Sequence, residues 1–291
     1  MVVDELLALG AGDVRALTVD PVRAALPAGV EVARGFLGRP STLAAAYAGV
    51  DVLYLAPYLP TVTEACRLAA EAGIGRIVDL AGPKGEHWQA VEDAVEECGV
   101  PFTHLEPGEF MANAAIWSRQ IRAGDEVRDV HGAAANAPIA QEDIAAVAAR
   151  ALLDRSLVGH SLELTGPEML SRRRKVELIG QALGRELRYV ELPRDEGIAE
   201  LATDMGEHAA WYVDGQAMLV EHPRRRPPRP SKSRADLRRR SFSGPAGTRI
   251  SSRTRNPIWW ARGGRVEFLL GAGNRANGVW GNWQPDWFWS S

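Results

Sequence analysis

The residues best placed for chemistry follow a short apolar run near the middle of the chain. Segment 106–110, with the sequence EPGEF, comes directly after the run 102–105. Pro107 and Gly108 would let a flat ring approach the backbone there, and Phe110 could form the wall of a neighbouring pocket. The alternative is a turn with a structural role only. The segment is therefore a candidate binding site at the end of a predicted strand.

Other groups that carry chemistry are few in this sequence. No Ser-His-Asp set or G-x-S-x-G turn is present, and no tyrosine is followed by lysine four residues later. Cys66 and Cys98 are predicted to be buried reduced thiols, with a disulfide or a reactive thiol as the alternative. The sequence predicts no metal site, because ligand spacing is lacking around His104, His131, His160 and His208.

The elements that must position these residues alternate along the chain. Short apolar runs predict strands at 14–18, 30–33, 51–56, 76–81, 102–105, 160–164 and 187–192. Amphipathic patterns predict helices at 2–9, 41–48, 61–72, 86–98, 141–153, 171–183, 196–205 and 207–219. We expect Thr61 (in a capping box) and Ser171 to cap two of these helices. Single helices between strands favour right-handed βαβ units, so the sequence predicts an α/β fold with a doubly wound parallel sheet.

Six segments carry a resemblance to a known family. The sequence is similar to the NmrA-like branch of the atypical short-chain dehydrogenases/reductases at 14–21, 30–57, 72–82, 99–114, 137–153 and 161–192. The resemblance implies a Rossmann-like sheet, a small α/β substrate-side part at about 107–222, and NAD or NADP as the cofactor. It implies either an NAD(P)H-dependent reductase of quinone-like or aromatic acceptors, or a non-catalytic regulator that senses the dinucleotide.

The resemblance also implies a site at the carboxyl ends of the strands, where ligands of such sheets bind. The implied cofactor-binding residues are Thr18, Val19, Phe36, Leu37, Ala56, Pro57, Tyr58, Ala81, Gly82, Pro107 and Gly108. The implied substrate pocket comprises His87, Trp88, Phe110, Asn113 and Trp117. Asn113 and Trp117 have an alternative, which is packing in the core. A lone histidine such as His87 is usually a surface or hydrogen-bonded residue, and the alternative is a role in acid–base catalysis.

The sequence departs from the family at several points. Relatives begin with a strand and a G-x-x-G-x-x-G turn that holds the pyrophosphate, whereas Met1 here falls in the following helix. We expect either a misplaced start or truncated gene, or a degraded domain that binds no cofactor. Val19 stands where NADP-binding members often carry Arg, Phe36 where relatives often have Asp, and Trp88 where many have Lys.

The two parts of the chain differ in charge. Residues 223–291 hold 15 of the 34 basic and 3 of the 37 acidic residues, a net charge of +12, so residues 1–222 carry −15. Reread in another frame, the codons from Arg229 onward can spell a family-like ending, which predicts a frameshift between about His222 and Arg229. The tail is expected to be disordered, and a nucleic-acid-binding arm is the rival interpretation.

Composition sets the remaining expectations. No run of residues approaches the roughly 20 apolar residues that a membrane span needs, and the N-terminus has no basic region before an apolar one. We expect a cytoplasmic protein that acts on a small molecule, as a monomer or a homodimer, without membrane or nucleic-acid partners.

Overall fold

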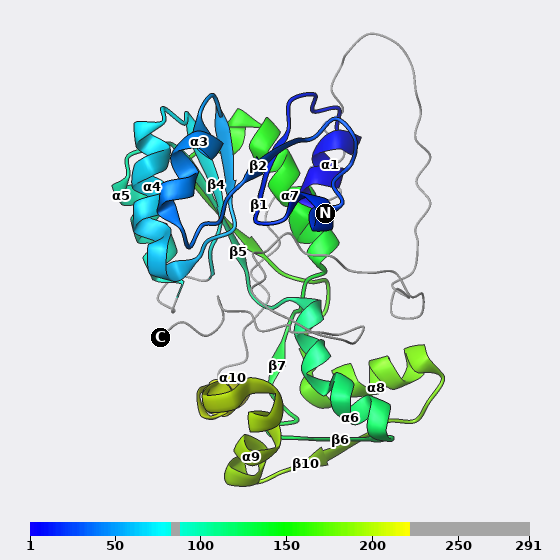
Figure 1. The fold of residues 1–291 in the computed structure, drawn as a ribbon. Helices are drawn as coiled ribbons and strands as arrows, with labels where there is room; N and C mark the ends of the chain where they lie inside the picture. Colours follow the sequence, from blue (N-terminus) through cyan, green and yellow to red (C-terminus); the bar gives the residue numbers. More distant parts are fainter. Residues whose placement is uncertain (83–87, 222–291) are drawn as a thin grey trace. The chain divides into compact units, whose positions relative to one another are not determined.

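The structure is a computed structural model that describes residues 1–82 and 88–221 (Figure 1). The described residues form two compact units, which we treat separately. Unit 1 comprises residues 1–112 and 138–167, and unit 2 comprises 113–137 and 168–221. The predicted tail, the frameshift and the expected site residue His87 lie outside the described residues.

Unit 1 is built on parallel strands. Its strands are β1 (Arg15–Thr18), β2 (Glu31–Arg34), β3 (Val52–Leu55), β4 (Arg76–Leu80), β5 (Phe102–Pro107) and β8 (His160–Leu164). Its α-helices are α1 (Val2–Ala8), α2 (Pro21–Ala24), α3 (Leu43–Tyr47), α4 (Val62–Glu71), α5 (Gln89–Glu97) and α7 (Gln141–Leu153), and short 3₁₀ turns lie at Pro40–Thr42, Leu59–Thr61 and Arg155–Leu157. Strands β3-β4-β5-β8 form one sheet and β1-β2 another, and every pairing is parallel.

Helices cover both faces of the four-stranded sheet, as the doubly wound prediction requires (Figure 1). On one face, α3, α4 and α5 pack against Leu55 and Ile77. On the other, α7 and the apolar side of α1 pack against Val78 and Leu105. Successive side chains of a strand point to opposite faces, so the apolar runs of β3 to β5 bury both faces at once. The α/β parallel fold is confirmed.

Three local predictions need correction. The predicted capping box at Thr61 is wrong, because its Oγ1 donates to the carbonyl oxygen of Leu37 at 2.8 Å and forms no cap bond with α4. The segment after β1, where no helix was predicted, forms a helical turn, α2, because the Asp20 carboxylate accepts from the amides of Val22 and Arg23 at 3.1 and 3.0 Å. Strand β5 extends to Pro107 because β8 pairs with it that far.

Unit 2 is a smaller α/β unit. Its strands are β6 (Glu126–Asp129), β7 (Ala135–Asn136), β9 (Leu170–Ser171) and β10 (Arg188–Glu191), and its α-helices are α6 (Ser118–Ala123), α8 (Arg172–Leu183), α9 (Arg194–Met205) and α10 (Ala209–Glu221). The 3₁₀ segment Met111–Trp117 leads into it, and another lies at Gly206–His208. Strand β10 pairs in parallel with β6, and β7 pairs antiparallel with β9.

Helix α8 begins and ends as its sequence predicts. The Ser171 hydroxyl accepts from the amide of Arg174 at 3.1 Å, and Gly184 ends the helix with a φ of 67°. Of the four consecutive basic residues, which suggest a solvated face, only Arg173 and Arg174 are exposed. Arg172 and Lys175 are 2% and 9% exposed, respectively. Buried partners hold both of them, Asp129 for Arg172 and Asn136 for Lys175.

Candidate functional site

The carboxyl ends of β3, β4 and β5 lie at one edge of the four-stranded sheet. Leu55 is opposite Asp79, and Leu80 is opposite Leu105, so the segments that follow these strands leave the sheet on the same side. Three of the predicted cofactor-binding segments begin there, 56–58, 81–82 and 107–108. This edge is therefore the candidate functional site.

The loop after β2 is tied to the end of β1. The amide of Gly35 donates to the carbonyl oxygen of Thr18 at 2.9 Å. Thr42 also fixes this loop, because its Oγ1 accepts from the amide of Phe36 at 3.1 Å. The predicted residues Thr18 and Val19 thus lie beside the segment that carries Phe36 and Leu37, on the β1–β2 sheet of unit 1.

Phe36 and Tyr58 come from different strand ends and meet. Their ring centroids are 5.4 Å apart with the planes inclined by 51°. Gly38 lies against both rings, because a Cβ at this position would stand 2.4 Å from Phe36 Cε1 and 3.0 Å from Tyr58 Cε1. The Thr61 hydroxyl bonds the carbonyl of Leu37 and so fixes the same loop to the start of α4. Flat aromatic surfaces of this kind can stack on a planar ring.

The end of β4 is covered by an indole. A Cβ at Gly82 would stand 2.4 Å from Trp88 Cδ1, so the ring lies directly over the backbone of Gly82. Ala81 is 6% exposed and belongs to the core on the α5 side of the sheet. The predicted pair Ala81 and Gly82 is thus brought together with the predicted pocket residue Trp88.

The end of β5 carries a glycine. The amide of Gly108 donates to the carbonyl of Leu164 at 3.1 Å, and a Cβ at Gly108 would meet no atom of the described residues within 4 Å. Phe110 forms a bridge with Ile139 and packs on the α7 side of the sheet. Gly108 therefore presents no side chain to a planar group that approaches this strand end, whereas Pro107 is buried.

The other two predicted pocket residues lie in unit 2. Trp117 is 2% exposed, and its Nε1 donates to Asp129 Oδ2 at 2.5 Å. The assignment of Trp117 to the substrate pocket is wrong: its ring packs in the core of this unit, which was the alternative. Asn113 is half-buried, and its Oδ1 has no hydrogen-bond partner among the described residues.

A buried histidine–carboxylate pair in unit 1 was missed. His104 Nδ1 lies 2.7 Å from Asp79 Oδ2, and both side chains are 0% exposed. Burial lowers the pKa of His104, but its hydrogen bond to Asp79 and the nearby carboxylates outweigh this, and the pKa is raised above its ordinary value. Burial also raises the pKa of Asp79. The signal was present in the sequence as one polar residue inside each of two apolar runs, RIVDLA and FTHLEP.

The two cysteines are free, so the disulfide alternative is excluded. Burial, first of all, raises the pKa of the Cys66 thiol to about 12, which leaves it protonated at neutral pH. Among residues 1–82 and 88–221, no group of three His, Cys, Asp or Glu side chains could hold a metal ion. No helix of this described part is long and apolar enough to cross a membrane.

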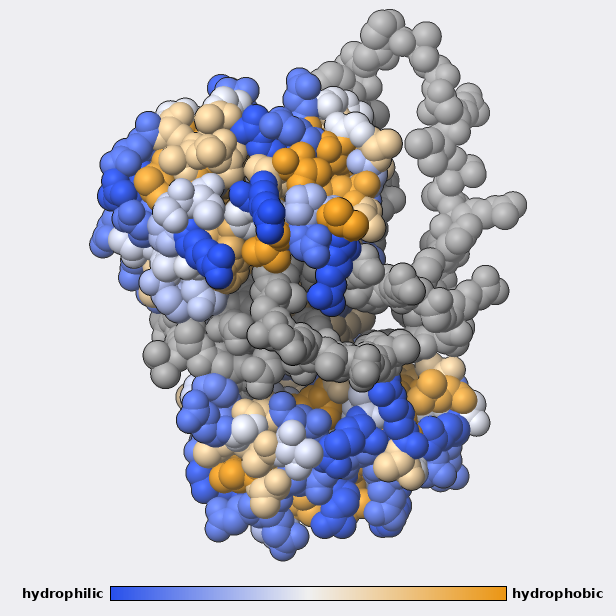
Figure 2. Space-filling model, viewed as in Figure 1, coloured by the Kyte–Doolittle hydropathy of each residue, from blue (hydrophilic) through white to orange (hydrophobic). Residues whose placement is uncertain are grey.

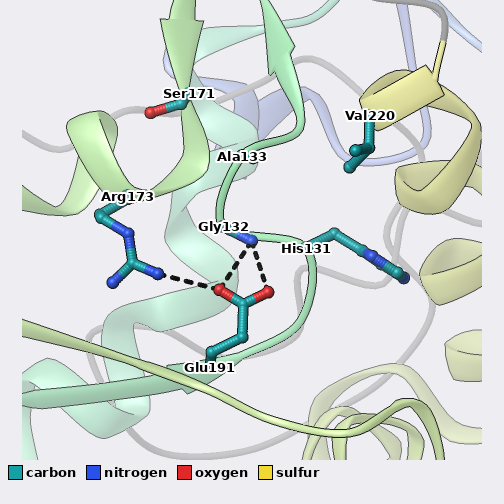
Figure 3. Close-up of a pocket in the computed structure, with 7 residues that line it drawn as sticks. All are labelled: His131, Gly132, Ala133, Ser171, Arg173, Glu191 and Val220. Carbon is teal, nitrogen blue, oxygen red and sulfur yellow. Dashed lines mark hydrogen bonds and ion pairs between the residues drawn. The ribbon is translucent and has the colours of Figure 1, made fainter.

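Unit 2 contains a cavity of about 490 Å³ that sequence reasoning did not anticipate (Figure 3). Its polar lining groups bond mainly to one another. The carboxylate of Glu191 accepts from the amide of Gly132 at 3.0 Å and pairs with Arg173 at 2.9 Å. The other lining residues are His131, Ala133, Ser171 and Val220. The cavity contains none of the predicted site residues, and its paired groups leave the edge of unit 1 as the better candidate.

The parallel sheet and its ligand-binding edge define a Rossmann-type protein, and solved structures agree. Triphenylmethane reductase from Citrobacter sp., in complex with NADP(H), matches with a TM-score of 0.67 and 18% identity over 81% of this chain and 89% of its own. The NADPH-dependent quinone oxidoreductase QOR2 from Escherichia coli matches with a TM-score of 0.66 and 21% identity over 76% and 84%.

Curated sequences narrow the class to a family. A (4-alkanoyl-5-oxo-2,5-dihydrofuran-3-yl)methyl phosphate reductase from Streptomyces griseus is 35% identical over 64% of this chain and 71% of its own length. An NAD(P)H azoreductase from Xenophilus azovorans is 31% identical over 61% and 67%. No protein-family model matches. The chain belongs to the NmrA-like family of NAD(P)-dependent reductases, an atypical branch of the short-chain dehydrogenases/reductases.

The residues present fit two of the three parts of a dinucleotide. The Phe36–Tyr58 pair offers a flat surface at the ends of β2 and β3, and Gly108 presents no side chain to a ring at the end of β5. The third part is the pyrophosphate. The glycine-rich turn that would bind it is not found among residues 1–82 and 88–221. The fit therefore concerns the adenine and nicotinamide ends of the cofactor.

Proposed function

We propose that this chain is an NAD(P)H-dependent reductase of quinone-like or aromatic acceptors. The observation that carries the proposal is its relationship to two reductases, one of which is an NAD(P)H azoreductase. The edge of unit 1, where the ends of β3, β4 and β5 meet, is where the fold family binds its cofactor. The cofactor supplies the hydride, and the protein supplies orientation and a pocket sheltered from water.

We assign the residues of this edge to two roles. Thr18, Val19, Phe36, Leu37, Ala56, Pro57 and Tyr58 hold the adenosine half, and Ala81, Gly82, Pro107 and Gly108 lie along the nicotinamide half. Trp88 and Phe110 form the acceptor pocket of unit 1. The close contact between Phe36 and Tyr58 and the open position at Gly108 support this division. We propose NAD or NADP as the cofactor. Val19 offers no cation to the 2′-phosphate that distinguishes NADP from NAD.

The described strands of unit 1 form two separate parallel sheets. Among the described strands, β1 pairs only with β2, and β3 pairs only with β4. Each therefore has an edge whose backbone groups lack a strand partner, which is costly in a sheet. Figure 2 shows hydrophobic residues gathered on the α1 and β1–β2 side, where exposed apolar side chains include Leu9, Val22 and Val32.

We also propose that the protein is cytoplasmic and works as a monomer or a homodimer. Light scattering of the purified full chain, before and after addition of dinucleotide, distinguishes the two oligomeric states. A larger assembly would contradict this part of the proposal.

The function is tested by mixing the full chain with NADPH or NADH and a panel of quinones, azo dyes and triphenylmethane dyes. We expect oxidation of one dinucleotide with at least one acceptor. Tight binding of the dinucleotide without turnover on any acceptor would favour the regulator instead. Absence of binding of either dinucleotide would indicate a degraded copy.

A further inference from the structure

A row of titratable side chains lines one face of the sheet in unit 1. Asp79 is opposite His104 in the β4–β5 register, and Glu106 follows His104 by two residues, so the three point to the same face. This is the face that α5 covers, through Val91 and Val95. Asp79 and His104 are 0% exposed, and Glu106 is 7% exposed. The proposed function assigns no role to these three residues.

The row runs from the surface of α5 to the end of β5. Glu96, whose side chain is 49% exposed, places Oε1 3.4 Å from His104 Nε2. The other ring nitrogen, Nδ1, lies 2.7 Å from Asp79 Oδ2. Asp79 in turn interacts electrostatically with Glu106. Glu106 directly precedes Pro107 and Gly108, at the carboxyl end of β5.

Two carboxylate oxygens in this row have no hydrogen-bond partner in the described part of the chain. They are Asp79 Oδ1 and Glu106 Oε1, and both are buried. A buried, unpartnered carboxylate oxygen is costly, whereas a carboxyl group that keeps a proton avoids burying a charge. A pair of neighbouring buried carboxyl groups that share one proton is a common solution.

We propose that Glu96, His104, Asp79 and Glu106 form a proton relay from the surface of α5 to the carboxyl end of β5, and that Glu106 holds the proton delivered there. This inference rests on the proposed function. When bound, the reduced nicotinamide supplies a hydride, which leaves an oxyanion on a quinone acceptor. The carboxyl O–H of Glu106 then breaks as a new O–H bond forms on that oxygen. The Glu106 carboxylate recovers a proton from solvent through Asp79, His104 and Glu96.

Sequence and electrostatics support this reading. The Tyr-x-x-x-Lys pair that donates protons in typical short-chain dehydrogenases does not occur in the chain, so another donor is needed. The groups that face the row are Glu92 and Glu96 from α5, Cys66 from α4 and Glu163 from β8. All are acidic or neutral. Burial, followed by the charge of Glu106, raises the pKa of Glu163. In this environment, burial first of all, and also the charge of Glu106, raise the pKa of Asp79.

The test uses Glu106→Gln, which keeps the shape but holds no transferable proton. The control is Glu71→Gln on α4, because Glu71 is an exposed carboxylate of the same unit that pairs with Arg67 and lies outside the row. With NADPH and a quinone, we expect Glu106→Gln to lower kcat by about 100-fold, with KM changed less than about twofold. Formate should restore part of the rate in Glu106→Ala. The control should keep the wild-type rate.

A second measurement needs no turnover. In the full chain labelled with ¹⁵N-histidine, NMR titration of the His104 ring should shift in Glu106→Gln and Asp79→Asn but not in Glu71→Gln. Equal rates for Glu106→Gln and Glu71→Gln, or a His104 titration that does not respond to Glu106→Gln, would overturn the relay. If the wild-type protein oxidises no dinucleotide, the proposed function fails. A His104 titration that still responds to Glu106→Gln would then show that the two residues are coupled independently of that function.

Discussion

Arg172 donates to Oδ2 of Asp129 in the core of unit 2, where the two side chains are 2% and 0% exposed. The guanidinium lies 5.2 Å from the centroids of both the Trp117 and Tyr212 rings, and it also donates to the Tyr212 hydroxyl at 2.7 Å. One ion pair therefore joins β6, α8, α10 and the 3₁₀ segment before α6.

Removal of the Arg172 charge should destabilise the protein strongly. Arg172→Met leaves Asp129 buried with one partner fewer, which costs about 3–5 kcal/mol for pairs of this kind. Arg174→Met is the control, since Arg174 is exposed and its pair with Glu177 is worth less than about 1 kcal/mol. Urea unfolding at pH 7 measures both. Similar losses in the free energy of unfolding for the two variants would show that the buried pair stabilises the protein no more than the exposed pair.

Two helical glycines should respond in opposite ways to alanine. In α9, a Cβ at Gly197 would stand 2.0 Å from Val130 Cγ1, whereas in α10 a Cβ at Gly215 would meet nothing within 4 Å. Gly215→Ala should therefore stabilise the protein by roughly 0.5–1 kcal/mol through helix propensity, and Gly197→Ala should destabilise it by about 1–3 kcal/mol. Thermal unfolding of both variants provides the comparison. Stabilisation by Gly197→Ala would contradict the packing of α9 on Val130.

Gly38→Ala should displace the Phe36 ring, because the new methyl group would overlap it. We expect a loss of about 1–3 kcal/mol in stability and roughly tenfold weaker binding of the dinucleotide, if the Phe36–Tyr58 pair holds the adenine. Gly12→Ala is the control, since a Cβ there would meet no atom within 4 Å. Calorimetric titration with NADPH and NADH measures the affinity. Wild-type affinity in a folded Gly38→Ala protein would remove this pair from the proposed site.

The Asp79–His104 pair predicts how stability depends on pH. The pKa of His104 is raised in the folded state, so its contribution is fully present below the unfolded value of about 6.5 and is lost as the pH rises through the folded-state pKa. The raised pKa of Asp79 acts in the same direction. The free energy of unfolding should fall by up to about 1.4 kcal/mol per pH unit above pH 6.5. His104→Asn should flatten this slope.

The control for this prediction is His160→Asn. His160 lies on β8, is exposed, and belongs to the same unit. Urea unfolding between pH 6 and 9 should give the wild-type slope for His160→Asn. A slope that survives in His104→Asn would place the titrating group elsewhere.

Much of unit 1 could be predicted because local and global requirements coincide there. The runs at β3 and β4 are apolar on both faces, which only a strand covered by helices on both sides permits. The helices between them carry one apolar side each, as α4 does with Val62, Cys66 and Ala69. The order of these elements then dictates a parallel sheet and its ligand-binding edge.

The parts that escaped prediction depend on tertiary partners. Strand β6 has only four residues, in which exposed and buried side chains alternate. Its sequence therefore did not distinguish it from a loop, and its pairing with β10 makes it a strand. Arg172 lies among other basic residues, and nothing in the sequence indicates that it is buried. Its ion pair with Asp129 in the fold explains the burial. Trp117 lies on a helical face that suits a pocket or a core equally, and the acceptor Asp129 decides between them.

The predicted site residues divide along the same line. Phe36 and Tyr58 were chosen as separate strand-end residues, and only the structure shows their rings in contact. The pairing of Asp79 with His104 needed the register of β4 and β5, which no spacing in the sequence reveals. Polar residues inside buried strands are the signal that would have found it.

The central claim is that NADPH or NADH lies along the carboxyl edge of the sheet in unit 1. Hydrogen–deuterium exchange of the full chain, with and without each dinucleotide, tests it most directly. We predict slower exchange at 18–20, 36–38, 56–58, 81–82 and 107–108 when the dinucleotide is present. Protection confined to the cavity around Gly132 and Arg173 in unit 2, or none in a chain that turns over NADPH, would contradict the claim.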